Sequence, residues 1–221
     1  MNIERIGVIG AGQMGNGIAH VCALAGYDVL LNDVKRDRIE AAFDIISGNM
    51  SRQVARGKIS DADKDKAMKR IHATPSLDDF SKVDLAIEAA TEDEKVKRQI
   101  FIDLCPKLSK NAMIASNTSS ISITRLATVT DRPERFIGLH FMNPAPLMQL
   151  VELIRGIATE DETFQTVHAL VHKLGKTPAN SEDFPAFIVN RILLPMINEA
   201  VYTLYEGVGT VEAIDVAMRL G

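Results

Sequence analysis

The stretch of sequence that decides the fold is IGVIGAGQMG, residues 6–15, near the start of the 221-residue chain. Its first four residues predict a short buried strand, and the apolar pattern over residues 14–26 predicts a helix that ends at a glycine. Between these two elements lie three glycines with the spacing Gly-x-Gly-x-x-Gly. Because this spacing follows a strand and opens a helix, it predicts a dinucleotide-binding site.

Each glycine of this motif has its own physical task. Gly10 allows a tight turn, Gly12 lets the backbone approach a pyrophosphate, and Gly15 lets the helix pack closely on the strand. The pyrophosphate would rest on the helix N-terminus, where free N–H groups and the helix dipole favour an anion. The cofactor-binding residues predicted from the motif are Gly10, Ala11, Gly12, Gln13, Met14 and Gly15.

The end of the second predicted strand indicates which nucleotide binds. Asp33 stands 18 residues after Gly15, where a carboxylate accepts hydrogen bonds from the ribose hydroxyls and repels a 2′-phosphate. This position favours NAD over NADP as the cofactor. Lys35 and Arg36 lie beside it and could accommodate a phosphate, so the choice between the two nucleotides stays open at this point.

Apolar runs alternate with helical patterns along the chain. The pattern predicts strands over residues 29–31, 85–87, 112–115, 136–139 and 150–154, and helices within 35–70 and over 95–108 and 161–174. Such alternation is typical of an α/β fold in which helices cover a parallel sheet. We therefore predict a doubly wound, Rossmann-type NAD-binding domain.

A change of composition after residue 184 predicts a domain boundary. We expect residues 1–184 to form the NAD-binding domain and residues 185–221 to form the start of an all-helical C-terminal domain. The first helix of that second domain is predicted over 186–207. Pro195 lies inside it and predicts a kink or a local break.

Composition limits the partners and the location of the protein. A net charge of −4 gives no general reason to bind nucleic acid, and no apolar run reaches the about 18 residues of a membrane span. The N-terminus enters a strand pattern at once, without the charged and apolar regions of a secretory signal. Cys22 and Cys105 form no disulfide framework and no metal-binding pair, which indicates reduced thiols. We expect a cytoplasmic protein with no metal.

Of the five histidines, His140 has the most informative surroundings. It ends the apolar run of a predicted strand, and ligands of open α/β sheets lie beyond the carboxyl ends of the strands. Glu152 lies in the apolar run that returns, where an unpaired carboxylate is costly to bury. An imidazole N–H of His140 would pair with Glu152, which would fix the tautomer. The alternative is that Glu152 faces solvent and His140 is structural.

Other polar positions are ambiguous from the sequence alone. Residues 116–120, SNTSS, directly follow a predicted strand and are compatible with a ligand site, a helix N-cap or a turn. Asn190 lies among apolar neighbours in FIVNR, residues 187–191. His168 and His172 share a helix face, but no carboxylate completes a metal site, so we expect a solvated face.

Together these motifs resemble those of the 3-hydroxyacyl-CoA dehydrogenase family, in particular its bacterial 3-hydroxybutyryl-CoA members, over essentially the whole chain. The segments that carry the resemblance are IGAGQMG (9–15), ASNTSS (115–120), GLHFMNP (138–144), LVE (150–152) and FIVNR (187–191). The resemblance implies NAD-dependent oxidation of a short-chain (3S)-3-hydroxyacyl-CoA to the 3-oxoacyl-CoA, or the reverse reduction of acetoacetyl-CoA, in fatty acid or butanoate metabolism.

The resemblance also implies roles for the residues of the reaction centre. His140 matches the family's catalytic histidine and Glu152 its carboxylate partner. Ser119 and Asn190 match residues that hydrogen-bond the reacting oxygen or the thioester of the substrate.

The remaining roles that the resemblance implies belong to the cofactor. Glu92 and Asn143 match positions near the nicotinamide half, and Lys97 matches a cofactor-contacting position. Ser119 is also predicted as a cofactor-binding residue.

The chain departs from the family pattern at two places. Family members usually have a glycine where this chain has Ala186, which calls the local backbone geometry into question. The chain also stops at Gly221, within the helical domain that supplies much of the family's dimer interface. We therefore expect a homodimer for the complete protein and weakened dimerisation for this fragment.

A basic segment predicts where a coenzyme A substrate binds. Residues 50–70 carry seven basic side chains against three acidic ones in an otherwise acidic chain. Arg52 and Arg56 have i, i+4 spacing in a predicted helix, so both would project from one face and grip phosphate oxygens. The alternative is a solvated helix face.

Two rival functions stay open on the sequence alone. One is a hydroxyacid dehydrogenase that uses no coenzyme A and would not need the basic segment. The other is an NAD-binding module without catalytic activity.

Overall fold

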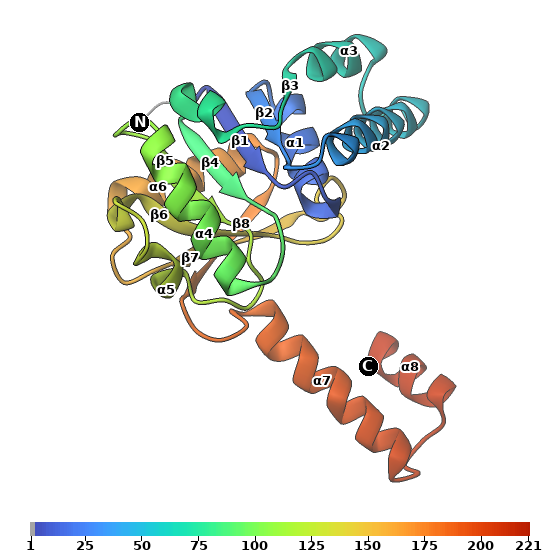
Figure 1. Ribbon diagram of the computed structural model, residues 1–221. Coiled ribbons are helices and arrows are strands. Elements are labelled where there is room, and N and C mark those ends of the chain that lie inside the picture. The colour runs from blue at the N-terminus through green and yellow to red at the C-terminus, as the bar shows by residue number, and fades with distance from the viewer. Residues whose placement is uncertain (1–2) are drawn as a thin grey trace.

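The computed structural model describes residues 3–221 and contains one eight-stranded sheet with the order β3-β2-β1-β4-β5-β6-β7-β8 (Figure 1). The strands are β1 (Arg5–Ile9), β2 (Asp28–Asn32), β3 (Ile71–Thr74), β4 (Leu85–Glu88), β5 (Met113–Ser116), β6 (Phe136–Phe141), β7 (Leu150–Arg155) and β8 (Thr177–Glu182). Strands β1 to β6 pair in parallel, β7 runs antiparallel to β6, and β8 runs parallel to β7. The order 3-2-1-4-5-6 is that of the doubly wound dinucleotide-binding fold, so the predicted fold class is confirmed.

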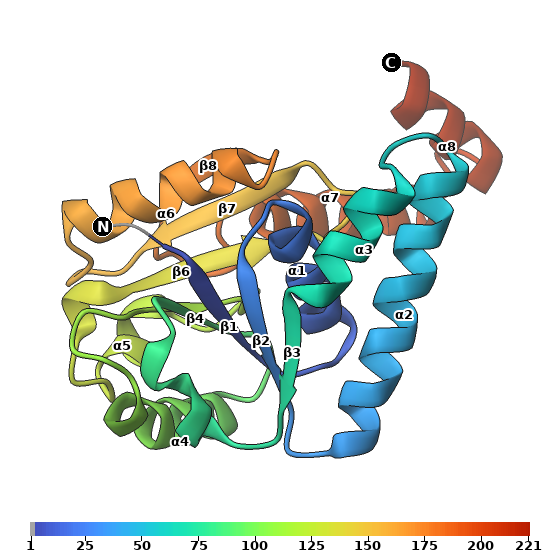
Figure 2. The ribbon, with the colours of Figure 1, turned by 90° about the horizontal axis from the view of Figure 1, so that it is seen from above.

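The helices fall into three groups (Figures 1 and 2). Those that cover the sheet are α1 (Gln13–Leu24), α4 (Glu94–Leu104), α5 (Ile123–Ala127) and α6 (Asp161–Lys173). A hairpin of α2 (Arg36–Ala55) and α3 (Asp61–Lys69) packs against α1 beside the β3 edge of the sheet (Figure 2). The last two helices, α7 (Val189–Tyr205) and α8 (Val211–Leu220), extend away from the sheet (Figure 1). Within residues 3–221 no helix is long and apolar enough to cross a membrane.

The predicted break within residues 35–70 is confirmed and has a clear local cause. Gly57 has a φ of 65°, a left-handed conformation that costs glycine little, and it follows directly on the end of α2. Ser60 then caps α3, because its side chain accepts from the N–H of Asp63 while the Asp63 carboxylate accepts from the N–H of Ser60.

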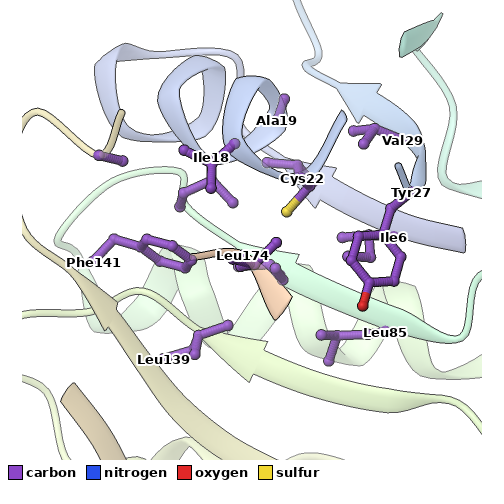
Figure 3. Close-up of a cluster of buried hydrophobic side chains, with 14 of the residues drawn as sticks. Ile6, Ile18, Ala19, Cys22, Tyr27, Val29, Leu85, Leu139, Phe141 and Leu174 are labelled. Carbon is purple, nitrogen blue, oxygen red and sulfur yellow. The ribbon is translucent and has the colours of Figure 1, made fainter. Parts of the chain in front are cut away.

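One face of the sheet is held to α1 by a continuous apolar core (Figure 3). Ile18 and Cys22 of α1 are fully buried against Ile6, Leu85 and Leu139 from three different strands. Burial of each large side chain contributes roughly 1.5–3 kcal/mol relative to leaving it exposed. This packing fixes the N-terminus of α1 at the carboxyl end of β1, where the glycine turn lies.

Two predicted helix boundaries are wrong, and the backbone explains both. The helix predicted from residue 186 begins only at Val189, because Ala186 and Phe187 have φ values of 67° and 54° and cannot belong to a right-handed helix. The helix predicted over 95–108 ends at Leu104 and continues as a short 3-10 segment that contains a proline.

Two further expectations about elements also need correction. Strand β8 was not expected, because its sequence TPANSE contains a proline and lacks apolar alternation. It lies at the sheet edge, where a proline is tolerated since its missing N–H faces away from the ladder. Helix α7 runs without interruption from Val189 to Tyr205 although it contains Pro195, so of the kink or local break predicted there the break is absent.

Candidate active site

The glycine turn has the geometry that its motif predicts. Gly10 has a φ of 101°, and a Cβ built on it would lie 2.7 Å from the carbonyl oxygen of Ala89. A Cβ on Gly15 would lie 1.7 Å from the Gly10 carbonyl oxygen, so both positions require glycine. A Cβ on Gly12 would meet no atom within 4 Å, which leaves open space above the N-terminus of α1.

The residues around this turn fit a dinucleotide. Gly12 caps α1 without a side-chain hydrogen bond among the described residues, so the first N–H groups of the helix are available to an anion. Asp33 directly follows β2 and is 7 % exposed. Its carboxylate accepts from the backbone N–H of Ala11 and of Lys35, both at 3.0 Å. These two bonds hold the carboxylate beside the turn, and its remaining lone pairs can accept from ribose hydroxyls.

His140 and Glu152 form a buried pair across two antiparallel strands. They are direct partners in the register of β6 and β7, so their side chains project from the same face of the sheet. His140 Nδ1 lies 2.8 Å from Glu152 Oε2, and the two residues are 5 % and 0 % exposed. The expected pairing is therefore present, and the alternative in which Glu152 faces solvent is wrong. A charged carboxylate accepts from Nδ1–H, which leaves the lone pair on Nε2.

The second oxygen of Glu152 connects this pair to the C-terminal helices. Glu152 Oε1 accepts from the backbone N–H of Ile188 at 3.1 Å and of Val189 at 2.9 Å. These N–H groups lie at the start of α7, so the carboxylate acts as an N-cap supplied from the sheet. The sequence signalled only that Glu152 needed a partner. It did not indicate that the backbone of residues 188 and 189 would supply two of its three hydrogen bonds.

Glu92 forms hydrogen bonds with the polar loop that follows β5. Its Oε1 atom accepts from the hydroxyl of Thr118 at 2.6 Å and from the backbone N–H of Ser119 at 2.8 Å and of Ser120 at 3.0 Å. Partial burial alone would raise the pKa of the Glu92 carboxyl, but these hydrogen bonds outweigh burial and lower it. Glu92 and Ser119 therefore lie together at the loop that follows β5. The helix N-cap in this region is instead Ser122, which caps α5.

Lys97 is 2 % exposed and lies in a buried polar cluster behind this loop. Its Nζ atom lies 2.8 Å from both oxygens of Glu88 and 3.8 Å from Glu92. Glu88 ends β4, is fully buried, and also accepts from the Ser116 hydroxyl at 2.7 Å. Lys97 thus pairs with two carboxylates at the carboxyl ends of the strands. Sequence reasoning missed Glu88, although its position at the end of an apolar strand is the same signal that singled out Glu152.

The other predicted residues lie in three segments: the first turn of α7, the loop after β6 and the end of α2. Asn190 is half-buried in the first turn of α7, next to the N–H groups that bind Glu152. Asn143 is exposed in the loop after β6. Arg52 lies in the last turn of α2, and Arg56 is the residue that ends that helix, so the expected helical i, i+4 pair is only partly correct.

Two neighbouring cavities lie between the two arginines and the glycine turn, and we refer to them together as the groove. Arg52 and Arg56 line a cavity of about 260 Å³ together with Lys58 and the loop at Pro144 to Leu147. A neighbouring cavity of about 470 Å³ shares Asn49 and the same loop, and it reaches Gly12. The arginines therefore do not touch the dyad, but they lie along one path that starts at the nucleotide turn.

Comparison with known proteins agrees with this geometry. The family model described as 3-hydroxyacyl-CoA dehydrogenase, NAD binding domain, matches residues 5–184, and that of the C-terminal domain matches residues 187–221. A 3-hydroxybutyryl-CoA dehydrogenase of Bradyrhizobium diazoefficiens is 66 % identical over 99 % of this chain and 75 % of that protein. A 3-hydroxyadipyl-CoA dehydrogenase of Escherichia coli is 39 % identical over 100 % of this chain and 46 % of its own length.

The fold is also similar to that of a solved structure. The crystal structure of an (S)-3-hydroxybutyryl-CoA dehydrogenase from Ralstonia eutropha is 46 % identical and has a TM-score of 0.97. The similarity covers 100 % of this chain and 78 % of that one.

Proposed function

Because the chain belongs to the 3-hydroxyacyl-CoA dehydrogenase family, we propose that it interconverts short-chain (3S)-3-hydroxyacyl-CoA and 3-oxoacyl-CoA with NAD as cofactor. The observation that carries this proposal is the buried His140–Glu152 pair, with Nδ1 and Oε2 2.8 Å apart. The pair lies at the carboxyl end of β6, and the glycine turn follows the carboxyl end of β1, so both lie at the same ends of the parallel strands.

The dyad supplies the proton chemistry of this reaction. Bound NAD supplies the hydride acceptor for C3 of the hydroxyacyl group. His140 takes the hydroxyl proton on Nε2, since its Nδ1–H is engaged by Glu152. Glu152 stabilises the imidazolium that results, and it is held in place by the N–H groups of Ile188 and Val189. In the reverse direction His140 returns the proton to the oxygen at C3.

Ser119 and Asn190 are proposed to bind the substrate on opposite sides of the dyad. Ser119 belongs to the loop that Glu92 holds, and Asn190 belongs to the first turn of α7. Side-chain donors at these two places would hydrogen-bond the reacting oxygen and the thioester carbonyl. We propose that the domain boundary lies near residue 184. The acyl group would then enter between the sheet domain and α7.

The coenzyme A part of the substrate is proposed to lie in the groove along α2. Arg52, Arg56 and Lys58 give one end of that groove a local positive charge in a chain of net charge −4. Guanidinium groups bind phosphate oxygens bidentately, which matches the phosphates of a coenzyme A nucleotide. The groove reaches Gly12, so a substrate bound there would extend toward the cofactor.

The exposed side chains of α7 and α8 bear on the oligomeric state of the protein, and its two cysteines bear on its location in the cell. Helices α7 and α8 leave large apolar side chains exposed, among them Leu194, Val201 and Tyr205 at 59 %, 60 % and 85 %. Apolar faces of this kind mark interaction surfaces, and we propose that they form a homodimer, which light scattering over a range of concentrations would detect. We also propose a cytoplasmic location and a role in fatty acid metabolism, and the free, buried Cys22 and Cys105 support the location.

One assay tests the proposed function. The absorbance of NADH should fall when acetoacetyl-CoA is added, and 3-hydroxybutyryl-CoA should form. NADPH should give a lower kcat/KM, because the Asp33 carboxylate repels a 2′-phosphate. Acetoacetate without coenzyme A should react poorly. Equal turnover of acetoacetate would favour a hydroxyacid dehydrogenase, and no turnover with any substrate would favour a non-catalytic NAD-binding module.

A further inference from the structure

The connector between β8 and α7 has an unusual backbone. Ala186 and Phe187 are consecutive residues with φ values of 67° and 54°, the left-handed region that disfavours side chains with a Cβ. Residues held in this region persist only where the surrounding structure determines them strongly. The connector therefore needs anchors at both of its ends.

Each end of the connector is anchored by a carboxylate. At its start, Asp183 accepts from the Ser122 hydroxyl at 2.6 Å and from the backbone N–H groups of Ile123 and Thr124 at 2.9 and 2.8 Å. At its end, Glu152 accepts from the two N–H groups that open α7. The Glu152 anchor is the same carboxylate that binds His140, so the connector and the dyad share one group.

The left-handed pair carries Phe187 inward onto the catalytic histidine. Phe187 is 3 % exposed, while Phe184, three residues earlier, is 65 % exposed. The ring centroids of Phe187 and His140 lie 5.7 Å apart with an angle of 58° between the planes. The side chain of His140 has one hydrogen bond among the described contacts, to Glu152, and a single bond leaves the imidazole able to rotate about it. The buried Phe187 ring lies beside the imidazole, so we expect it to limit this rotation.

We infer that Phe187 is a positioning residue for His140, and that the left-handed turn at Ala186 and Phe187 is what places its ring there. This inference rests on the proposed function for its kinetic readout but not for its spectroscopic one. Phe187 touches neither reacting atom. It acts by holding Nε2 in the direction from which the substrate hydroxyl is reached, and misplacement by about 1 Å in such geometry costs about 100-fold in rate.

The first test replaces Phe187 with leucine and compares it with a matched variant. Phe164 is 7 % exposed, and its ring lies 5.9 Å from that of His168 on α6, so Phe164→Leu removes a buried ring beside a histidine that has no part in the reaction. We expect Phe187→Leu to lower kcat for acetoacetyl-CoA by about tenfold or more while KM changes little. Phe164→Leu should keep kcat near that of the unmodified protein, although both variants lose some thermal stability.

A second variant tests the turn without removing the ring. Ala186→Val places a β-branched residue at a φ of 67°, where it is strongly disfavoured, so it should displace Phe187 and reproduce the loss of kcat. The matched control is Ala200→Val inside α7, which lies away from the connector. A kcat for Phe187→Leu within about twofold of that for Phe164→Leu would overturn the inference, whether or not Ala186→Val folds.

A spectroscopic readout separates this inference from the proposed function. The Nδ1–H proton of His140, bound to Glu152, should give a downfield NMR signal in the protein with no substrate added. Phe187→Leu should broaden that signal and speed the exchange of the proton with solvent, and Phe164→Leu should leave both unchanged. If the unmodified protein failed to reduce acetoacetyl-CoA, the proposed function would fail while this comparison still decided the positioning role. An unchanged signal in Phe187→Leu would reject that role.

Discussion

At the scale of single residues, the site is built from carboxylates that each hold several donors. Glu152 binds His140 and two N–H groups, and Glu92 binds Thr118 and the serine loop. Glu88 receives Lys97, the Ser116 hydroxyl and a backbone N–H, and it is fully buried. A buried charge is tolerated only when it is paired and hydrogen-bonded, so these groups are sensitive to the loss of one partner.

The Glu88–Lys97 pair gives the clearest prediction at this scale. Lys97→Met keeps the length of the side chain but leaves the Glu88 carboxylate without its cation. Removing one partner of a buried ion pair costs about 3–5 kcal/mol, so the free energy of unfolding should fall by an amount of that order in urea denaturation. Lys95→Met, at an exposed position of the same helix, should change it by less than about 0.5 kcal/mol. Similar effects of both substitutions would contradict a stabilising role for the pair.

At the scale of elements, the sequence predicted most of the sheet and little of its last edge. The glycine motif and the apolar runs indicated β1, β4, β5 and β6, because buried parallel strands are nearly continuous apolar segments. Strand β8 escaped prediction because TPANSE is polar and lies at an edge, where pairing depends on β7 and not on its own pattern.

The site shows the same division between what could and could not be predicted. His140 and Glu152 could be paired in advance, since each stood out in an apolar strand. Their direct opposition depends on the register of β6 and β7, which no local pattern specifies. The anchoring of Glu152 by residues 188 and 189 depends on the left-handed turn at Ala186 and Phe187. The sequence does not predict this turn, because alanine and phenylalanine rarely adopt a positive φ.

Asp183 gives a prediction for the connector as an element. Partial burial raises the pKa of its carboxyl, but the hydrogen bonds from Ser122 and Thr124 outweigh burial and lower it. A carboxyl with a lowered pKa in the folded state contributes stability above its unfolded pKa, and this contribution is lost as the pH falls through the folded value. Asp183→Asn should therefore cost about 1 kcal/mol at neutral pH, and the difference should shrink in acid.

The control for this prediction is Asp44→Asn, which changes an exposed carboxyl on α2. Urea unfolding of both variants and the unmodified protein, at neutral pH and in acid, gives the comparison. A deficit of Asp183→Asn that stayed constant or grew as the pH fell would contradict the assigned role of the charged carboxylate.

At the scale of the whole molecule, the three proposed sites are built from elements that lie far apart in the sequence. The glycine turn lies at the end of β1, the dyad at the end of β6, and the basic groove runs along α2 from Gly12 to Arg56. The α2–α3 hairpin lies outside the sheet and packs on α1, with the start of α2 beside the carboxyl ends of the strands and its basic end farther away (Figure 2). This arrangement suits a long substrate with a charged tail.

The groove leads to a prediction that involves two arginines together. Arg52→Ala with Arg56→Ala should raise KM for acetoacetyl-CoA about tenfold or more, since each charged hydrogen bond to phosphate contributes about 1.5–3 kcal/mol. Added salt should imitate the effect in the unmodified protein. Acetoacetyl-pantetheine, which lacks the nucleotide, should respond little to the same substitutions.

The control for the arginine pair removes the same charge elsewhere. Lys82→Ala with Lys110→Ala changes two exposed lysines that precede β4 and β5, at the amino ends of these central strands. Its KM for acetoacetyl-CoA should stay close to that of the unmodified protein. Equal KM values for the arginine variant and the lysine variant would remove the coenzyme A nucleotide from this groove.

The measurement that tests the central claim most directly is a comparison of His140→Gln with His172→Gln. His172 is exposed on α6, so the control makes the same chemical change away from the dyad. The rate of acetoacetyl-CoA reduction should fall about 10²- to 10⁴-fold in His140→Gln, because a general acid–base is lost, and should not change in His172→Gln. NADH binding, followed by fluorescence, should be nearly the same in all three proteins. An unchanged kcat in His140→Gln would contradict the account.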